Sequence, residues 1–444
     1  MASRLFSGMQ ICAYSIRDEG AQTAVDIMVD KGKVGTIYAT TNLPAERHPD
    51  SIGEFPHNPV RKSYYTQGGL YFDPHAHHYR NKKFKFAKTP EDGLRDSDVI
   101  KEIVQVARAK GVRILPWVIA LHDDVLAGLN QQYAMIDFLG RPIRGWLCPS
   151  NPEVESFLSD MVEDLLSNYD IQGIFLDLIR FPEWGGIEGG LGAALSCFCP
   201  RCTAKAKCLG LDLEKVRRRF RYIVSGLGDT VNSFLTLRRG YLDLARLIID
   251  EPEVAEWIRF RQRIITELVE RIHRTVKNTK PSAELALDIW PPSYSWLLGQ
   301  NYEKLSEHCD SIKYFTYQKL GGGVDISAVL DKFLKFDHRI TANELLDLFY
   351  RMFGFRGPTD LQELKLKGLS VDLVANETAK AVSEVGGKAR VYAGIQIWNV
   401  TKDEIREAMT GAIRAGAEGF VYLGYDWATL ENIEAVGEIV DEIT

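Results

Sequence analysis

Short runs of apolar and β-branched residues alternate along this chain with longer stretches in which apolar residues recur every three or four positions. The short runs are typical of buried parallel strands, and the longer stretches are typical of helices with one apolar face. Eight runs have the strand pattern, at residues 10–14, 34–40, 112–118, 173–177, 284–290, 311–316, 390–397 and 419–425. The alternation predicts a parallel sheet covered by helices.

The stretches between the runs carry signals of helix ends. Apolar residues keep helical spacing over 99–107 and stop before Gly111, a residue that suits the position after a helix. Pro152 lies in the first turn of a second amphipathic stretch, and Thr401 with Glu404 forms a capping box before a third. Eight strands with helical crossovers, followed by one last helix, favour a closed (β/α)8 TIM barrel over an open sheet.

The spacing between the predicted strands is uneven. Long insertions follow strands two, four and six, at about residues 42–92, 178–254 and 317–387. Insertions at these places extend the face on which barrel enzymes build their active sites. No linker composition or fixed-period repeat interrupts the chain, so we expect one catalytic barrel domain over residues 1–444.

Composition excludes several classes of protein. The formal charge is −6 and basic residues are scattered, so the footprint of a nucleic-acid binder is missing. No apolar stretch is long enough to cross a membrane and the first residues do not resemble a secretory signal, so we expect cytoplasmic residence without membrane attachment. Self-association into a homo-oligomer remains open.

Three of the seven cysteines are close together in the sequence. Cys197, Cys199 and Cys202 form C-x-C-x-x-C, a spacing that lets three thiolates converge on one tetrahedral ion. Cys148, in the neighbouring loop after strand three, is the expected fourth ligand, and Cys208 competes with it. The pattern predicts a structural zinc site, because four protein ligands leave no position for substrate. The alternative is a set of buried cysteines without metal.

These motifs resemble those of known families. CPSNP after strand three together with CFCPRC after strand four resembles the zinc-bearing β-galactosidases, and YDIQGIFLDLIRFP followed by CFCPRC is similar to glycosyl-hydrolase-like barrel families. LGQNYEKLSEHCDSIKYFTY and GAEGFVYLGYDW resemble later strands of those families, so the resemblance runs from about Asp98 to the C-terminus. It implies a TIM barrel that acts on carbohydrate. The β-galactosidases, however, use an Asn-Glu pair on strand four and a glutamate on strand seven, where this chain has Leu176-Asp177 and Gln396.

Two carboxylates are the candidates for catalysis of glycosidic bond cleavage, and the expected outcome is retention of configuration. Asp177 ends strand four and would attack or stabilise the anomeric carbon, with Arg180 lowering its pKa. Asp288 has inward parity near the end of strand five and would be the acid/base. Asp426 and Glu183 are competitors, and a structural, ion-paired Asp177 is the alternative.

Aromatic side chains gather at the same strand ends, where sugar rings could stack on them. They are Trp117, Trp146, Trp184, Trp290, Tyr317, Trp398, Tyr425 and Trp427. The polar residues expected to bind substrate are Arg180, His122, Lys313, Gln396, Asn399, Asp426 and His77.

A histidine-rich turn supports a rival function. His75, His77 and His78 lie in the insertion after strand two and could hold a catalytic metal in a sugar lyase, isomerase or aldolase. A barrel that binds saccharide without turnover is the third hypothesis. No organic cofactor is expected, and carbohydrate is the expected partner in all three.

Overall fold

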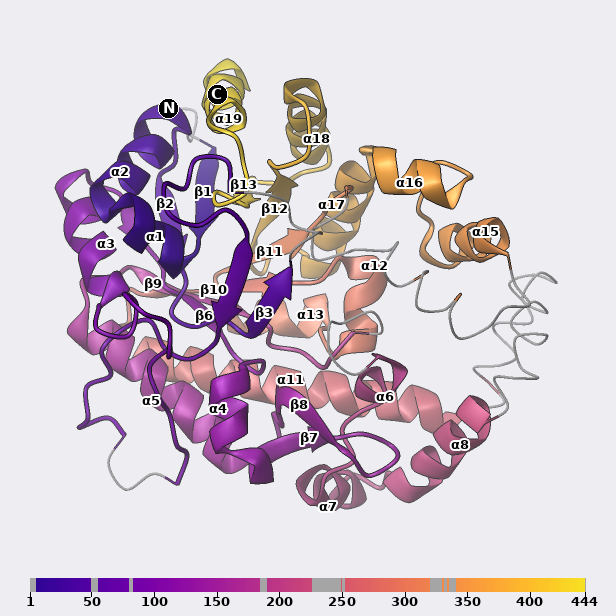
Figure 1. Ribbon diagram of the computed structural model, residues 1–444. Helices are drawn as coiled ribbons and strands as arrows, with labels where there is room; N and C mark the ends of the chain where they lie inside the picture. Colours follow the sequence, from indigo (N-terminus) through magenta and orange to yellow (C-terminus); the bar gives the residue numbers. More distant parts are fainter. Residues whose placement is uncertain are drawn as a thin grey trace.

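The computed structural model describes residues 5–48, 55–79, 83–183, 190–225, 252–319 and 341–443, together with 249, 330 and 334. A parallel sheet lies at the centre and helices surround it (Figure 1). Its order is β5-β2-β1-β13-β12-β11-β10-β9-β6. The strands are β1 (Phe6–Ile11), β2 (Thr36–Ala39), β5 (Arg113–Ile114), β6 (Trp117–Ile119), β9 (Gly173–Asp177), β10 (Glu284–Ile289), β11 (Ser311–Phe315), β12 (Arg390–Gln396) and β13 (Gly419–Leu423).

The sheet closes on itself because its two end members are consecutive pieces of one strand. β5 pairs with β2, and β6 pairs with β9. Between them, the Leu115 N–H donates to the Ile37 carbonyl (3.1 Å), and the Pro116 carbonyl accepts from the Phe175 N–H (2.9 Å). Pro116 has no N–H, so the ladder is interrupted there. The strand predicted at 112–118 is thus present in two parts, and the TIM barrel is confirmed.

Helices cover the outside of the barrel. The capping box at Thr401 and the helix end near Gly111 are both confirmed, and Asn151 caps the helix that contains Pro152. The covering helices are α1 (Ala13–Glu19), α2 (Ala21–Asp26), α3 (Val99–Ala109), α5 (Pro152–Asn168), α11 (Pro252–Thr279), α13 (Tyr302–Leu305), α17 (Asp372–Val385), α18 (Lys402–Arg414) and α19 (Leu430–Ile443). Their buried faces form the main core with the strands.

The three predicted insertions are present, and a fourth follows strand three. It contains α4 (Asp124–Leu129) and the antiparallel pair β7 (Ala134–Ile136) and β8 (Pro142–Leu147). The insertion after strand two contains the pair β3 (Ala45–His48) and β4 (Tyr64–Gln67). The insertion after strand four contains α6 (Gly190–Ala194), α7 (Pro200–Cys208) and α8 (Leu213–Ser225), and α12 (Pro292–Ser295) follows strand five. The insertion after strand six contains α15 (Ala342–Phe353) and α16 (Leu361–Lys367), which share a small separate core.

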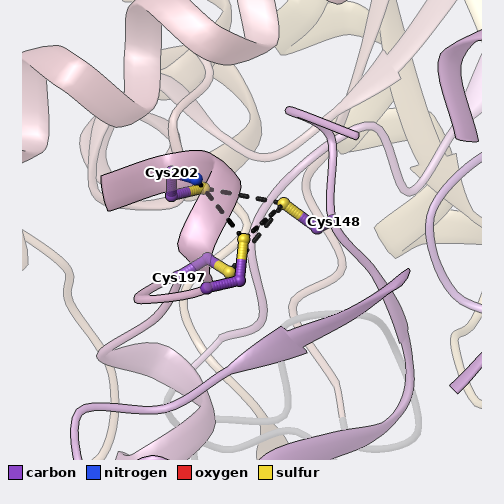
Figure 2. Close-up of side chains that lie close together, drawn as sticks. Cys148, Cys197 and Cys202 are labelled. Carbon is purple, nitrogen blue, oxygen red and sulfur yellow. Dashed lines mark hydrogen bonds between the residues drawn. The ribbon is translucent and has the colours of Figure 1, made fainter. Parts of the chain in front are cut away.

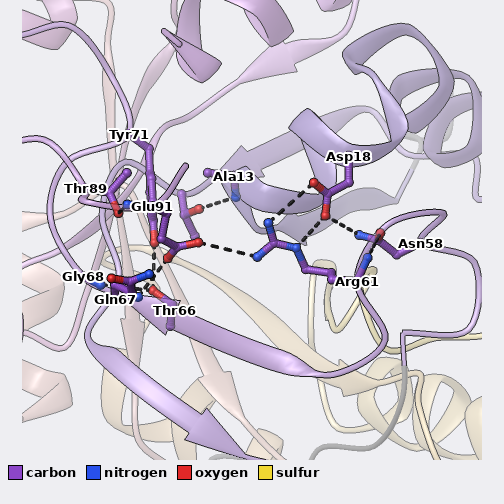
Figure 3. A network of polar contacts seen from close by, with 11 residues as sticks. Ala13, Asp18, Asn58, Arg61, Thr66, Gln67, Gly68, Tyr71, Thr89 and Glu91 are labelled. Atoms are coloured by element: carbon purple, nitrogen blue, oxygen red, sulfur yellow. Dashed lines mark hydrogen bonds and ion pairs between the residues drawn. The ribbon is translucent and has the colours of Figure 1, made fainter. Parts of the chain in front are cut away.

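A network of polar contacts fixes the strand-two insertion to the barrel (Figure 3). Arg61 lies between two carboxylates, with its Nε 2.5 Å from Asp18 Oδ2 and its Nη1 3.6 Å from Glu91 Oε2. Asn58 donates to the same Asp18 carboxylate (3.1 Å), and Glu91 accepts from the Gln67 N–H (2.8 Å). The insertion is therefore joined to α1 by groups with little exposure to solvent, where charge pairing is less screened.

The first predicted strand was placed too late in the sequence. β1 covers Phe6–Ile11, and Ala13 already begins α1, with its N–H donating to Thr40 Oγ1 (2.7 Å). Gly8 obscured the strand, because glycine is poor in the strand pattern. It is required there, since a Cβ at this position would lie 2.7 Å from the Tyr38 ring. Trp184 lies outside the described residues. None of the helices described is long and apolar enough to cross a membrane.

Candidate functional site

Strand register brings the predicted carboxylates together inside the barrel. Asp288 on β10 pairs with Lys313 on β11, and Leu176 pairs with Leu287. Asp177 and Asp288 follow those two leucines and take the next position in the same register. Equivalent positions on neighbouring strands have the same parity, so both carboxylates lie on the inner face near the C-terminal ends of the strands. Both residues are buried, with 6% of Asp177 and 1% of Asp288 exposed.

Asp288 forms a buried ion pair. Lys313 Nζ lies 2.9 Å from each of its carboxylate oxygens, and Gln10 Nε2 donates to Oδ2 at 3.1 Å. Lys313 also donates to the Tyr317 hydroxyl (2.8 Å). Burial raises the pKa of Asp288, and the adjacent ammonium of Lys313 opposes this rise. What distinguishes Asp288 is the ammonium of Lys313 held against both of its oxygens, and its expected acid/base role stays a prediction.

Asp177 has a different environment. Trp117 Nε1 donates to its Oδ2 at 2.9 Å, and the Leu178 N–H donates to Oδ1. Burial raises the pKa of Asp177 above its ordinary value, although Lys313 and, more weakly, Arg180 act to lower it. Arg180 therefore acts on the pKa of Asp177 in the expected direction, but burial outweighs it and the net pKa is raised. A carboxyl group with a raised pKa is suited to donating a proton.

Arg180 pairs with a different carboxylate, Glu183. Its Nη1 donates to Glu183 Oε2 and to the Phe181 carbonyl (3.1 Å). The guanidinium lies 5.2 Å from the ring centroids of both Trp146 and Trp290. Burial acts to raise the pKa of Glu183, but the charge of Arg180 together with hydrogen bonds from Arg180 and the backbone outweighs it, and the net pKa is lowered. The surroundings therefore shift the two pKa values in opposite directions, that of Asp177 upward and that of Glu183 downward.

The predicted aromatic residues form a separate cluster at this end of the barrel. Trp290, Tyr317 and Trp398 are buried together with Phe315 and Leu298. The ring centroids of Tyr317 and Trp398 are 5.2 Å apart. Trp290, Tyr317 and Trp398 pack against one another next to Lys313, and this group is called the aromatic wall below. His122 joins the wall beyond Arg180, stacked on Trp146 with 4.5 Å between centroids.

Gln396 and Asp426, which were expected to bind substrate, have other contacts. Gln396 accepts from the Lys319 N–H and donates to the Trp398 carbonyl, both at 3.0 Å, so it joins two loops. Asp426 accepts from the Cys12 N–H at 3.3 Å, and burial raises its pKa to about 6.

His77 is exposed, and its turn packs against the far end of α5, where His75 bonds Asp164 at 2.8 Å. α5 runs from the site toward the start of β9, so His77 is remote from Asp177.

The prediction from the sequence missed some polar groups near the site. Gln10, which bonds Asp288, is a polar residue with inward parity on a strand, and that signal could have identified it. Glu19 accepts from the Tyr425 hydroxyl (2.7 Å) and lies 3.1 Å from His57 Nδ1. Tyr425 is several hundred positions from Glu19 and His57 in the sequence, so no local pattern connects the three residues.

The four predicted cysteines come together at one place (Figure 2). Their sulfur atoms all lie within 4.8 Å of one another, and all four residues are buried. Cys148 Sγ is 3.5 Å from the sulfurs of Cys199 and Cys202, and 3.9 Å from that of Cys197. Cys148 follows β8, Cys197 precedes α7, Cys199 caps that helix, and Cys202 lies in its first turn. Cys208, at the end of α7, is exposed and is not part of the cluster.

The sulfur positions fit a tetrahedral ion. With zinc to sulfur bonds of about 2.3 Å, the sulfur atoms of a tetrahedron are about 3.8 Å apart. The three distances from Cys148 Sγ, 3.5 to 3.9 Å, are close to this edge length. Within the described part of the chain this is the one cluster of metal-ligating residues found, and the histidine turn does not form another. The rival hypothesis of a catalytic metal at His75, His77 and His78 is therefore not supported.

The sequence matches no protein-family model and no curated protein. Solved structures share the fold. The PgaB (BpsB) glycoside hydrolase domain from Bordetella bronchiseptica aligns with a TM-score of 0.54 and 13% identity, over 98% of this chain and 98% of that one. Alpha-L-fucosidase isoenzyme 2 from Paenibacillus thiaminolyticus gives 0.52 and 12%, over 99% of this chain and 49% of that one. Beta-galactosidase from the psychrophilic Marinomonas ef1 gives 0.54 and 10%, over 99% and 59%.

This similarity establishes the fold. The resemblance to glycosyl-hydrolase-like barrels expected from the sequence is confirmed at the level of architecture, and the structural neighbours named are glycoside hydrolases. The chain matches nearly all of the first of these structures but only about half of the fucosidase.

Proposed function

We propose that this protein is a glycoside hydrolase that cleaves a glycosidic bond at the C-terminal mouth of its barrel. Two observations support this proposal. The fold is shared with glycoside hydrolases, and the mouth of the barrel holds carboxylates in contrasting environments. Hydrolysis of an acetal requires one carboxyl group that is protonated and another that is ionised. The contrast between Asp177 and Glu183 is the single observation that carries the proposal.

In the proposed mechanism, Asp177 is the proton donor. Burial keeps its carboxyl group neutral to higher pH, and the Trp117 indole fixes its orientation. It protonates the leaving-group oxygen, which makes that oxygen a better leaving group. Glu183, held ionised by Arg180, either stabilises positive charge at the anomeric carbon or attacks that carbon as its bond to the leaving-group oxygen breaks. A water molecule that gives its proton to Asp177 then takes the place of Glu183 at the anomeric carbon, which releases the sugar. This assignment changes the sequence-based one, in which Asp177 was the nucleophile and Asp288 the acid/base.

We propose that Asp288 and Lys313 tune the site through their effect on the pKa of Asp177. Their ion pair holds a fixed positive charge near Asp177, and this charge limits how far burial raises the pKa of Asp177. A proton donor works best when its pKa is close to the operating pH, so such a limit is useful. The wall of Trp290, Tyr317 and Trp398 lies beside these groups, and we propose that the sugar ring packs at its edge.

We also propose that the four-cysteine cluster binds one structural zinc ion. Cys148, Cys197, Cys199 and Cys202 would hold it, and the ion would supply a fixed crosslink between the loops after strands three and four. No position is left for substrate, so the reaction is carried by the side chains at the barrel mouth.

Substitution of Asp177 tests the proposal. The purified protein is assayed against a panel of aryl glycosides and oligosaccharides, and the product anomer is identified by NMR, with retention expected. Asp177→Asn should lower turnover at least about 100-fold while leaving the thermal unfolding midpoint close to that of the wild type. Asp92→Asn, at a fully exposed aspartate, is the control. Wild-type turnover in Asp177→Asn would refute the assignment, and saccharide binding without any turnover by the wild type would favour a binding protein.

A further inference from the structure

His57, in the strand-two insertion, is a buried histidine whose two ring nitrogens both face oxygen atoms. Only 7% of its side chain is exposed, and only 3% of the side chain of Glu19 beside it. His57 Nδ1 lies 3.1 Å from Glu19 Oε2, and Nε2 lies 2.9 Å from the Tyr425 carbonyl oxygen. A carboxylate and a backbone carbonyl can only accept hydrogen bonds. Both ring nitrogens must therefore carry hydrogen, which makes the ring a charged imidazolium.

The neutral ring would fit this place poorly. It has one N–H, so either the Glu19 carboxylate or the Tyr425 carbonyl would face a nitrogen lone pair. A buried acceptor that loses its donor costs the free energy of its desolvation. Loss of the proton would thus weaken one of the two contacts by which His57 holds α1 and the loop after β13.

The charges around His57 favour the imidazolium. Glu19 at the end of α1 is in direct contact with the ring, and Asp426, next to Tyr425, adds negative charge. Burial alone would lower the pKa of His57, but Glu19, the Tyr425 carbonyl and Asp426 outweigh it, and the net pKa is raised. The Tyr425 hydroxyl donates to the same Glu19 oxygen at 2.7 Å, which keeps that oxygen in place.

The two cations that follow His57 in the same segment are held by other groups (Figure 3). Arg61 pairs with Asp18 on α1 and with Glu91, and Lys62 Nζ donates to a backbone carbonyl at 2.9 Å. Arginine keeps its charge throughout the physiological pH range, whereas histidine is the side chain that ordinarily titrates near neutrality. The charge of this segment that changes near neutral pH is therefore that of His57.

The segment of His57 also reaches the mouth of the barrel. Phe55, two residues earlier, stacks on Tyr14 with 5.4 Å between ring centroids and lies 6.5 Å from Trp427. Trp427 in turn lies 5.6 Å from Trp398 of the aromatic wall. The position of this segment therefore affects the packing of the side chains beside the proposed sugar site.

We infer that His57 is a protonated clamp: its imidazolium fastens residues 55–62 to α1 and to the loop after β13, and loss of its proton loosens them. The docking of this segment, and with it the packing of Phe55 against Trp427, then depends on pH. The inference does not depend on the proposed hydrolase reaction, and both experiments below measure the clamp without an activity assay.

NMR of the protein with nitrogen-labelled histidine gives the protonation state of the ring. In the wild type both ring nitrogens of His57 should carry hydrogen at about pH 6, and its pKa should lie above 6.5. Glu19→Gln removes the contacting charge and should lower this pKa. His57→Gln identifies the signal, and His77→Gln, at an exposed histidine of the same insertion, should leave it unchanged. A ring at about pH 6 with one nitrogen free of hydrogen would overturn the clamp.

Amide hydrogen exchange measures the docking itself. The Phe55 N–H donates to the Lys62 carbonyl at 3.2 Å, so its exchange reports whether the segment is held. Wild type and His57→Gln are compared at the same pH, which cancels the effect of pH on intrinsic exchange. Because the folded pKa is raised, the extra protection of the wild type should be complete below about pH 6.5 and should disappear as the pH rises through that pKa. It should fall about tenfold for each unit between the pKa values of the docked and the released histidine.

Two outcomes of the exchange experiment would overturn the inference. One is equal protection in wild type and His57→Gln at every pH. The other is a difference that does not change with pH, because packing alone would then hold the segment. Glu19→Gln, which keeps the histidine, gives the same comparison if His57→Gln does not fold, and its protection should be lost at lower pH than that of the wild type.

Discussion

The ammonium nitrogen of Lys313 lies 2.9 Å from each carboxylate oxygen of Asp288, and both side chains are almost completely buried. Two strands that are adjacent in the barrel, β10 and β11, place them in direct register. The ion pair lies close to Asp177 in the barrel interior. Its contribution to the stability of the fold is therefore the first property to test.

Lys313→Met should destabilise the protein strongly. The substitution leaves the Asp288 carboxylate buried without its cation, and breaking one side of a buried ion pair costs about 3 to 5 kcal/mol. Chemical denaturation measures the free energy of unfolding. Lys388→Met, which breaks an exposed pair with Glu307, should cost less than about 1 kcal/mol. Similar small losses in both variants would mean that the buried pair contributes little.

Turnover should follow a bell-shaped pH profile. Asp177 must be protonated to donate, so activity falls as the pH rises through its pKa, which burial has raised above 3.8. Glu183 must be ionised, so activity falls as the pH drops through its pKa, which lies below 4.5. Glu183→Gln should remove the acid limb and leave the basic limb in any residual activity. A basic limb that persists unchanged in Asp177→Glu would contradict the role of Asp177.

Asp426 should make the protein less stable as the pH rises from 4 to 6. Its folded pKa is about 6, against about 3.9 in an unfolded chain, so the folded state binds more protons in this window. Ionisation then costs about 3 kcal/mol at neutral pH by the same linkage. Asp426→Asn cannot ionise, and its stability relative to the wild type should increase by about that amount between pH 4 and pH 7. Parallel stability curves for the two proteins would show that the carboxyl group titrates normally.

Cys148→Ser should release the zinc ion, whereas Cys208→Ser should keep it. Cys148 lies within the cluster and Cys208 is exposed outside it. Elemental analysis of the purified proteins gives the zinc content. The wild type and Cys208→Ser should each hold one ion per chain, and Cys148→Ser should lose it together with part of its thermal stability, because metal binding and folding are coupled. Retention of the ion by Cys148→Ser would remove this residue from the ligand set.

Gly394→Ala should disturb the site through the barrel wall. A Cβ at this position would lie 2.2 Å from the Tyr314 carbonyl oxygen and 2.8 Å from Lys313 Cε. We expect a loss of at least about 1 to 3 kcal/mol in the free energy of unfolding, from overpacking, together with reduced turnover. Gly411→Ala on α18 meets only Ala375 Cβ at 3.4 Å and should be neutral or stabilising by up to about 1 kcal/mol. Equal effects in the two variants would contradict the close approach at Gly394.

The sequence alone determined the architecture and part of the metal site. Strand and helix periods are local properties, so the eight strands and the capping box at Thr401 could be predicted, except where Gly8 and Pro116 weakened the strand pattern. Cys197, Cys199 and Cys202 are also close in sequence, which made the cluster recognisable. Inward parity predicted that Asp288 lies inside the barrel, and the structure buries it there beside Lys313.

Only the tertiary structure decided which groups meet. Arg180 pairs with Glu183 and not with Asp177, Asp288 pairs with Lys313, and His77 lies beside α5 away from the mouth. Parity gives the face on which a side chain lies, but its partner depends on the register between strands far apart in the chain. The direction of each pKa shift depends in addition on burial, a property of the assembled core that no short stretch of sequence contains.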